Sequence, residues 1–406
     1  MKRRGTLVNV SALLANRGLE LLLPLITLPF LVKTLGVETY GRVAVAAAFS
    51  IYFSGLTMYG FHMTGTRDIA QLSGTVSAAV TRAREIFSAS LFLAIAGSSV
   101  AALLVLVVPS WRGDAALLLA SLLQAQVTAL SPSWFFQGME EATRIVVPSL
   151  VSKVAYLLLL LLIVREPGDA VVVPLAGAAS GALGLALAIR AARLRYGVRF
   201  GVGFSVATFQ TIRGGASAAT AQLAPSLYNA STTMVLGLTA SAGAVGAWSI
   251  AVRVVETLCS VGNVVISALT APLARGAISF RRATVLVVGF GFLLMAAGVA
   301  LSAPVASYLT AGDLDRTVCA LILMLSVWPM AIVWRAHFGV NGLVVRGADD
   351  LYRNIVLASS AGGLVASLLF VPRLGTTAAA AVVSGTATLM ACWAYLAARP
   401  IIRRSP

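Results

Sequence analysis

The chain has 406 residues, of which 59% are hydrophobic and only 11% charged, and its mean hydropathy is +0.93. Soluble domains contain about one quarter charged residues, so this composition excludes a soluble enzyme and indicates a polytopic membrane protein. The formal net charge of +16 does not indicate a nucleic-acid partner, because the basic residues lie in short loops between apolar stretches, as membrane topology requires. The three cysteines and two histidines show no metal-ligand spacing, and we expect no metal or cofactor.

The first apolar stretch follows a basic N-terminal segment, Lys2, Arg3 and Arg4, and no small-residue cleavage site comes after it. A cleavable signal peptide would need such a site. We therefore expect this stretch to remain in the membrane as a first span, with its N-terminus in the cytoplasm.

A helix needs about 20 apolar residues to cross a bilayer, and twelve stretches of the chain meet that length. These predicted spans are residues 7–32, 41–65, 86–109, 115–137, 145–164, 170–190, 209–238, 243–271, 283–307, 317–345, 352–372 and 375–398. When the loops are assigned alternately to the two sides, most of the 30 lysines and arginines fall on the side of the N-terminus. This bias predicts that both ends of the chain lie in the cytoplasm.

The longest basic loop, residues 188–200, separates the first six predicted spans from the last six. Six is an even number, so both halves enter the membrane from the same side, as in parallel-repeat transporters. The predicted fold is an all-α polytopic membrane protein with twelve transmembrane helices in two six-helix lobes around a central cavity. The lobes are expected at residues 1–194 and 195–406.

Polar side chains recur at helical spacing inside three of the predicted spans. In span one, Asn16 and Glu20 share a face and Arg17 flanks them. In spans seven and eight, one face carries the residues Thr211, Gln222, Ser226, Asn229 and Thr233, and Ser249, Arg253, Glu256, Ser260, Asn263 and Ser267, respectively. Lipid cannot satisfy such faces, since each central charge costs about 3 kcal/mol or more to insert.

A network that only joins helices could explain one short polar stripe. Three stripes, together with Arg335 in span ten, favour a water-filled cavity between the lobes. Trp134, Phe135 and Phe136 lie at a predicted cytoplasmic interface, where they are expected to form an aromatic belt. The chain shows no nucleophile elbow, HExxH motif or carboxylate cluster, so the sequence predicts a transporter and not an enzyme.

Three stretches resemble motifs of one protein family. Residues 28–41 (LPFLVKTLGVETYG), 51–70 (IYFSGLTMYGFHMTGTRDIA) and 131–141 (SPSWFFQGMEE) are similar to signatures of bacterial polysaccharide flippases of the Wzx type. These proteins belong to the superfamily of multidrug, oligosaccharidyl-lipid and polysaccharide exporters. The resemblance covers the N-terminal half, while the C-terminal half agrees mainly in the layout of its spans.

The resemblance implies an inner-membrane protein that flips an undecaprenyl-pyrophosphate-linked oligosaccharide by alternating access, coupled to a proton or sodium gradient. It also implies membrane lipids as surroundings and a polysaccharide polymerase and a chain-length regulator as partners. Relatives carry cavity arginines on spans one and eight, which is where Arg17 and Arg253 lie here.

Guanidinium groups bind phosphate oxygens in pairs, so Arg17, Arg253 and Arg335 are the candidate pyrophosphate ligands. The candidate glycan ligands are amide side chains that can bond sugar hydroxyls, namely Asn16, Gln222, Asn229 and Asn263. Glu20 and Glu256 each follow an arginine by three residues. They either form local ion pairs or take up the coupling ion. The intramembrane charges sum to one positive charge, fewer than a cavity for anions would suggest.

Several other functions stay open. A drug or cation antiporter of the same superfamily should carry unpaired acids in its cavity. A membrane glycosyltransferase or polymerase should carry a long external loop with catalytic groups. A scaffold for the assembly complex would work without Arg17 and Arg253.

Overall fold

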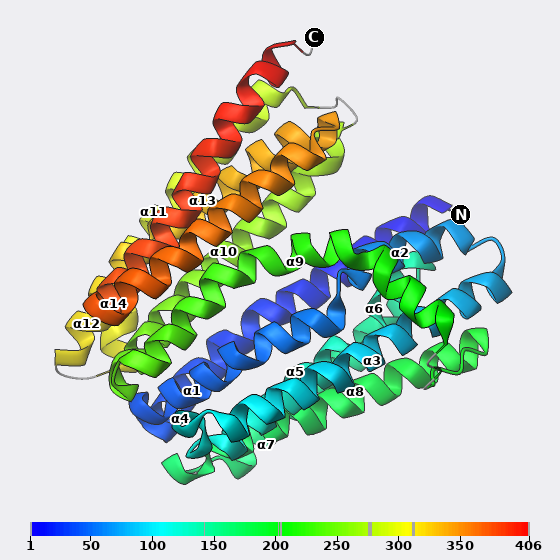
Figure 1. Cartoon of the computed structure of the whole chain (residues 1–406). Coiled ribbons are helices and arrows are strands. Elements are labelled where there is room, and N and C mark those ends of the chain that lie inside the picture. Colours follow the sequence, from blue (N-terminus) through cyan, green and yellow to red (C-terminus); the bar gives the residue numbers. More distant parts are fainter. Residues whose placement is uncertain are drawn as a thin grey trace. The chain divides into compact units, whose positions relative to one another are not determined.

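The computed structural model describes residues 2–141, 143–201, 203, 205–274, 278–310 and 313–404. Within these ranges it describes all side chains except those of residues 2–22, 25, 217–218, 221–222, 224–227, 271, 274, 313–315 and 401–404. The described part of the chain is helical with short connections and contains no strand (Figure 1). The prediction of an all-α polytopic membrane protein is confirmed.

The helices of the first half are α1 (Lys2–Met58), α2 (Phe61–Leu72), α3 (Val76–Val107), α4 (Pro109–Arg112), α5 (Ala115–Ala129), α6 (Ser133–Gly138), α7 (Thr143–Ile163), η1 (Pro167–Val171) and α8 (Val172–Tyr196). Those of the second half are α9 (Val206–Thr239), α10 (Ala242–Ala274), α11 (Phe280–Leu309), α12 (Asp313–Leu325), α13 (Val327–Ala336), the π-helix η2 (His337–Leu343), η3 (Val344–Arg346) and α14 (Asp349–Arg404). Each predicted span lies on one or more of these helices.

Nine helical segments within the described residues are long and apolar enough to cross a membrane. Two of them, Ile26–Leu72 and Asp349–Pro400, are longer than a single crossing requires, since about 20 helical residues span the hydrocarbon. Each segment contains a break at a glycine: Gly36 has φ 79° and Gly375 has φ 62°. The break at Gly36 falls in the predicted loop between spans one and two, and the break at Gly375 falls at the predicted start of span twelve. The total of twelve spans itself stays a prediction.

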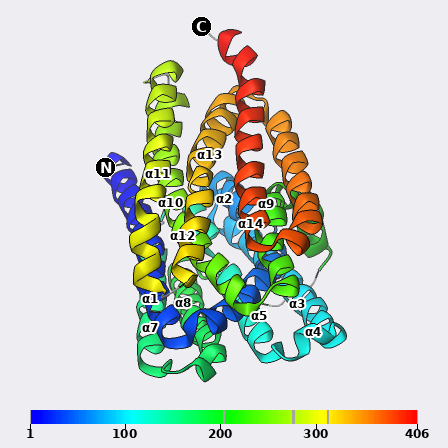
Figure 2. The same ribbon diagram turned by 90° about the vertical axis from the view of Figure 1, so that its left-hand side faces the viewer.

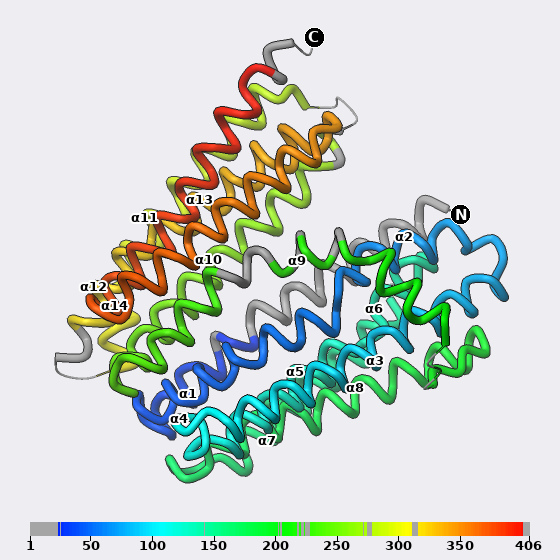
Figure 3. The backbone as a smooth tube through the Cα atoms, in the orientation of Figure 1, coloured from blue at the N-terminus to red at the C-terminus, as the bar shows by residue number. Residues whose placement is uncertain are grey.

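The break at Gly375 turns α14 back on itself. Its two arms lie side by side in both ribbon views (Figures 1 and 2), and the backbone trace follows the turn between them (Figure 3). A positive φ is strained for residues with a Cβ and free for glycine, so glycine at this position allows the sharp reversal.

The chain forms two compact units. The first contains residues 1–27 and 45–223, and the second contains residues 28–44 and 224–406. The division cuts through α1 and through α9, so each unit includes a segment from the other half of the sequence. The two six-helix lobes, residues 1–194 and 195–406, stay a prediction.

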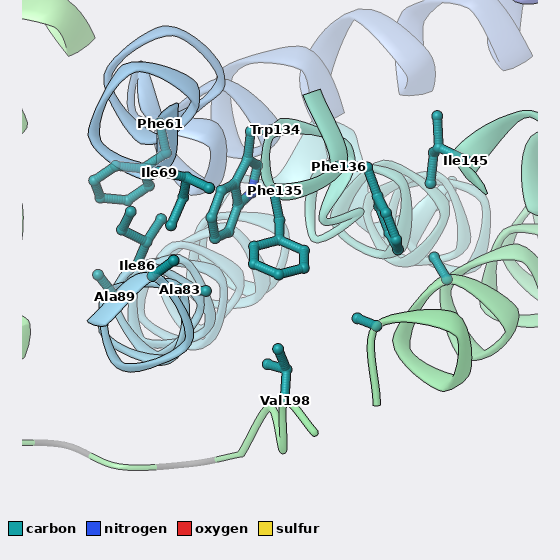
Figure 4. Close-up of a cluster of buried hydrophobic side chains, with 13 residues drawn as sticks. Phe61, Ile69, Ala83, Ile86, Ala89, Trp134, Phe135, Phe136, Ile145 and Val198 are labelled. Atoms are coloured by element: carbon teal, nitrogen blue, oxygen red, sulfur yellow. The ribbon is translucent and has the colours of Figure 1, made fainter. Parts of the chain in front are cut away.

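The centre of the first unit is an aromatic cluster at α6. Trp134 is 5% exposed, and Phe135 and Phe136 are fully buried. They belong to one cluster of buried side chains, in which Trp134 lies beside Ile69 of α2 and Phe136 lies towards Ile145 of α7 (Figure 4). The prediction of an interfacial aromatic belt for these three residues is therefore wrong. Their side chains form a core because α6 is a short helix enclosed by α2, α3 and the segment after α8, whereas a belt needs an outward-facing span.

The second unit depends on a close approach between α1 and α10. A Cβ atom added at Gly246 would lie 2.1 Å from the carbonyl oxygen of Val37, and one added at Gly41 would lie 2.4 Å from the carbonyl oxygen of Ala242. Both obstacles are backbone atoms, which cannot rotate away. Small residues allow such contacts between membrane helices, and here they fix residues 28–44 of α1 against α10.

Replacing Gly246 with alanine should therefore push α1 away from α10 and destabilise the protein by about 1–3 kcal/mol, the usual cost of overpacking. Gly243→Ala is the matched control on the same helix, because a Cβ at Gly243 meets nothing within 4 Å. Thermal unfolding of the detergent-purified variants measures the effect. Equal melting temperatures for the two variants would contradict this packing.

Candidate functional site

The polar stripe of α10 is present, but its hydroxyl groups are already bonded. Ser249, Ser260 and Ser267 each donate to the backbone carbonyl four residues earlier. Such bonds satisfy the hydroxyl within its own helix. The groups of the stripe that remain to bind a ligand are therefore the charges of Arg253 and Glu256 and the amide of Asn263.

The rotation of α10 is fixed by its opposite face. Trp248, Ala251 and Val255 are completely buried, and the indole N–H of Trp248 donates to Thr233 Oγ1 of α9 at 3.0 Å. With this face packed, Arg253 and Asn263 are exposed. An exposed guanidinium on a membrane-spanning helix is unfavourable against lipid, so this face is suited to water or to a polar ligand.

Arg253 and Glu256 form an ion pair, which is one of the two roles that their spacing left open. Arg253 Nη1 lies 3.4 Å from Glu256 Oε2, and the two side chains are 48% and 36% exposed. A partly exposed pair of this kind contributes only about 0–1 kcal/mol. The pair is therefore weak enough for a stronger anion to compete with Glu256 for the arginine. Tyr40, from the α1 segment of the same unit, lies within electrostatic range of both charges.

Arg335 on α13 is the second arginine of the predicted site that lies in this unit. Its Nη1 atom approaches Met390 Sδ of α14 at 3.6 Å, a weak acceptor, and its Nε atom is buried without a hydrogen-bond partner. It makes no salt bridge with any carboxylate in the described part of the chain. An uncompensated charge inside a membrane is costly. Of the two arginines, Arg335 therefore has the greater need of an anionic ligand.

Packing explains how α13 holds Arg335. Val333 is fully buried and lies in a cluster with Ile266 of α10 and Leu294 of α11. Successive helical residues turn by about 100°, so Arg335 lies on the side of α13 away from Val333. It lies within electrostatic range of Tyr228 on α9 and of Cys259 on α10.

The second unit thus brings three predicted site residues towards one another. Cys259, one turn after Glu256 on α10, lies within electrostatic range of both Glu256 and Arg335. Asn229 follows Tyr228 on α9 and is partly buried, while Asn263 lies further along α10. The result is a cluster of two arginines and one glutamate, which we call the α10–α13 cluster: Arg253, Glu256 and Arg335.

The other predicted site residues are Asn16, Arg17, Glu20 and Gln222. The first three lie on α1 and the fourth on α9, but their side chains are outside the described residues. Their roles as cavity ligands therefore stay predictions.

The predicted stripe of α9 is used differently at its two ends. Thr233 accepts the bond from Trp248, and Thr211 accepts a hydrogen bond from Arg82 Nη1 at 2.8 Å. Each hydroxyl is held in a contact within a single unit, Thr211 in the first and Thr233 in the second, and the prediction that these threonines line a cavity stays a prediction. Helical spacing identified the face of α9 but could not show what packs against it.

The charge network around Arg82 was missed from the sequence. Arg82 on α3 bonds Asp68 of α2 at 2.9 Å and 3.1 Å and Glu85 at 2.9 Å. Asp68 lies on α2 within residues 51–70, one of the three stretches that resemble the family, and this was the available signal. The network joins α2, α3 and α9 within the first unit.

A buried π-helix, η2, was also not predicted. His337 is fully buried, its Nε2 lies 2.9 Å from Thr284 Oγ1, and its ring stacks on Phe280. The amide of Asn341 is 1% exposed and has no hydrogen-bond partner. Single turns of π-helix often occur at functional sites, and this one directly follows the helix that carries Arg335.

Comparisons with known proteins identify the family. The profile of the family described as "Polysaccharide biosynthesis protein" matches residues 6–274. This is more than half of the chain, so the protein belongs to the polysaccharide biosynthesis protein family.

Two curated relatives carry the description "Putative O-antigen transporter". One, from Escherichia coli (strain K12), is 27% identical over 161 residues, which are 40% of this chain and 39% of the relative. The other, from Shigella dysenteriae, is 27% identical over 168 residues, which are 40% of this chain and 41% of the relative. The matched segment thus spans about two fifths of each relative's length.

Solved structures define the fold. The lipid II flippase MurJ in an inward closed conformation matches with a TM-score of 0.75 at 10% identity, covering 97% of this chain and 87% of MurJ. An inward-facing multidrug resistance transporter of the MATE family matches with a TM-score of 0.62 at 13% identity, covering 94% and 98% of the two chains. At these identities the likeness shows a shared fold and not a shared substrate.

Proposed function

We propose that the protein is a flippase of the bacterial inner membrane that moves undecaprenyl-pyrophosphate-linked oligosaccharide from the inner to the outer leaflet. The observation that carries this proposal is Arg335, a permanent cation on a membrane-spanning helix with a buried, unpartnered Nε. Family membership and the shared fold with MurJ support the same class of function. The partial match to the O-antigen transporters suggests the type of cargo.

Pyrophosphate suits the α10–α13 cluster. It is a compact anion with several acceptor oxygens, and guanidinium groups bind such oxygens in a planar, paired geometry. Arg335 offers its Nε donor, which has no partner among the described residues, and the ion pair that the described structure gives Arg253 is the weak one with Glu256. Arg17 on α1 would add a third guanidinium.

Glycan recognition is assigned to side-chain amides, which both donate to and accept from sugar hydroxyls. Asn263 is exposed and Asn229 is partly buried in the described structure. Asn16 and Gln222 complete the proposed set. The polyprenyl tail needs no polar ligand and remains in the lipid.

In alternating access, the empty cavity must return to its inward-facing state after the cargo is released. Glu256 would couple this return to the uptake of an ion. When pyrophosphate occupies Arg253, the Glu256 carboxylate loses its partner and becomes able to bind a proton or sodium. Glu20 would act in the same way beside Arg17. Both termini are proposed to be cytoplasmic, with a polysaccharide polymerase and a chain-length regulator as partners.

A drug or cation antiporter is the second candidate, because the fold is also that of MATE transporters. A cationic substrate requires an acid that is free to pair with it. Within the α10–α13 cluster the acid is Glu256, which pairs with Arg253, while the uncompensated charge is positive. The charge of this cluster therefore favours an anionic substrate.

A deletion strain that carries Arg335→Gln should fail to export its polysaccharide and should accumulate the lipid-linked oligosaccharide. One charged hydrogen-bonding contact contributes about 1.5–3 kcal/mol, which corresponds to a loss of roughly 10- to 150-fold in transport rate. Arg373→Gln is the matched control, since Arg373 is exposed and lies at the turn of α14. Membrane abundance of each variant, measured by immunoblot, separates loss of function from loss of protein. Full rescue by Arg335→Gln would refute the assignment.

Glu256→Gln should leave cargo binding intact and remove the response of transport to an imposed ion gradient. The amide keeps the size of the side chain but cannot take up a proton. Flipping by the purified protein in liposomes, with and without a pH or sodium gradient, measures this effect. Asp350→Asn serves as the control, because Asp350 is 83% exposed in a surface pair with Arg353. An unchanged gradient dependence in Glu256→Gln would contradict the coupling role.

A further inference from the structure

The first unit carries a groove between α7 and α8 that plays no part in the proposed transport site. Its volume is about 660 Å³. Its walls are formed by Arg144, Val147 and Pro148 from α7 and by Leu187, Arg190 and Leu194 from α8.

The groove combines exposed apolar walls with a cationic end. Val147 is 63% exposed and Leu194 is 76% exposed, which is unusual in water for side chains of this size but suits contact with acyl chains. Arg190 is exposed on the same stretch of α8. The groove opens beside the basic segment 188–200, which is predicted to face the cytoplasm.

The charges of the groove leave one cation available. Glu141 pairs with Arg144 and lies 3.3 Å from Arg195 Nη2. Burial alone would raise the pKa of the Glu141 carboxyl, but hydrogen bonds from Arg144 and Tyr196 outweigh it and lower the pKa. The carboxylate is therefore ionised at neutral pH and offsets Arg144. Arg190 has no ion pair in the part of the chain that the structure describes.

The single unpaired cation, Arg190, indicates the charge of the anion that the groove can bind. The three charged lining residues, Glu141, Arg144 and Arg190, carry one net positive charge. This matches the single negative charge of a phosphodiester. Pro148 also has no N–H to give to the carbonyl of Arg144, as a residue in a helix interior normally would. A headgroup that carries hydroxyl donors could bond this carbonyl.

We propose that the α7–α8 groove binds an anionic phospholipid of the cytoplasmic leaflet, with its phosphate on Arg190 and Arg144 and an acyl chain along Val147 and Leu187. Basic pockets between transmembrane helices on the cytoplasmic side are known to bind anionic headgroups. Phosphatidylglycerol fits best, because it combines one phosphodiester charge with glycerol hydroxyls. The bound lipid would hold α7 and α8 together at their cytoplasmic ends.

The test uses the purified full-length protein and native mass spectrometry, with phosphatidylglycerol and phosphatidylcholine of identical acyl chains as probes. The wild type should retain phosphatidylglycerol in preference to phosphatidylcholine. Arg190→Gln should weaken phosphatidylglycerol binding about five-fold, since a basic residue near the headgroup contributes about that factor. The matched control is Arg193→Gln, which removes an exposed arginine of the same helix that does not line the groove, and it should leave binding unchanged.

A second variant tests the groove without changing its charge. Leu187→Trp should fill the space for the acyl chain and weaken phosphatidylglycerol binding while Arg190 remains in place. The proposal is overturned if Arg190→Gln binds phosphatidylglycerol as the wild type does, or if Arg190→Gln and Arg193→Gln weaken binding equally. Equal retention of phosphatidylcholine, or tighter retention of a polyprenyl pyrophosphate, would also overturn it.

Discussion

A charge inside a membrane must have a partner, and this constraint organises the second unit. Hydrocarbon cannot solvate a guanidinium, yet α13 holds Arg335 with a buried Nε that meets no acceptor. The side chain is fixed there by the packing of Val333 against α10 and α11. A protein that needed only a stable helix would place leucine or methionine at this position, so the cost indicates a function.

The same constraint separates the two arginines of the cluster. Arg253 carries its own carboxylate partner three residues away, so its charge is compensated when no ligand is bound. Arg335 has no such partner among the described side chains. Arg335 therefore needs an anionic ligand at all times, whereas Arg253 releases Glu256 when it binds an anion. In the proposed mechanism, this difference would let the cluster bind a pyrophosphate and also respond to an ion.

The sequence was sufficient for features that depend on local periodicity. It predicted the helical membrane fold and interruptions of the helices at Gly36 and next to Gly375, and it offered the ion pair of Arg253 with Glu256 as one of two alternatives. It was insufficient where the outcome depends on residues distant in the chain. From the sequence alone, an interfacial belt and a buried core are equally consistent with the aromatic run Trp134, Phe135 and Phe136. The packing of α2 and α3 against them shows that they form a core. Thr211 lies on the predicted polar face, but its bond to Arg82 joins helices that no spacing rule connects. Arg335 was the least regular of the predicted ligands, because its importance follows from the contacts of α13 and not from a stripe.

The central claim is that Arg335 binds the pyrophosphate of the cargo, and direct binding measures it without the complexity of a living cell. The affinities of the purified wild type and of Arg335→Gln should be compared for a polyprenyl pyrophosphate and for the corresponding monophosphate. Binding through two guanidinium groups predicts that the wild type prefers the pyrophosphate and that Arg335→Gln loses most of this preference. Equal affinity of the wild type for the two lipids, or a preference that survives in Arg335→Gln, would contradict the account.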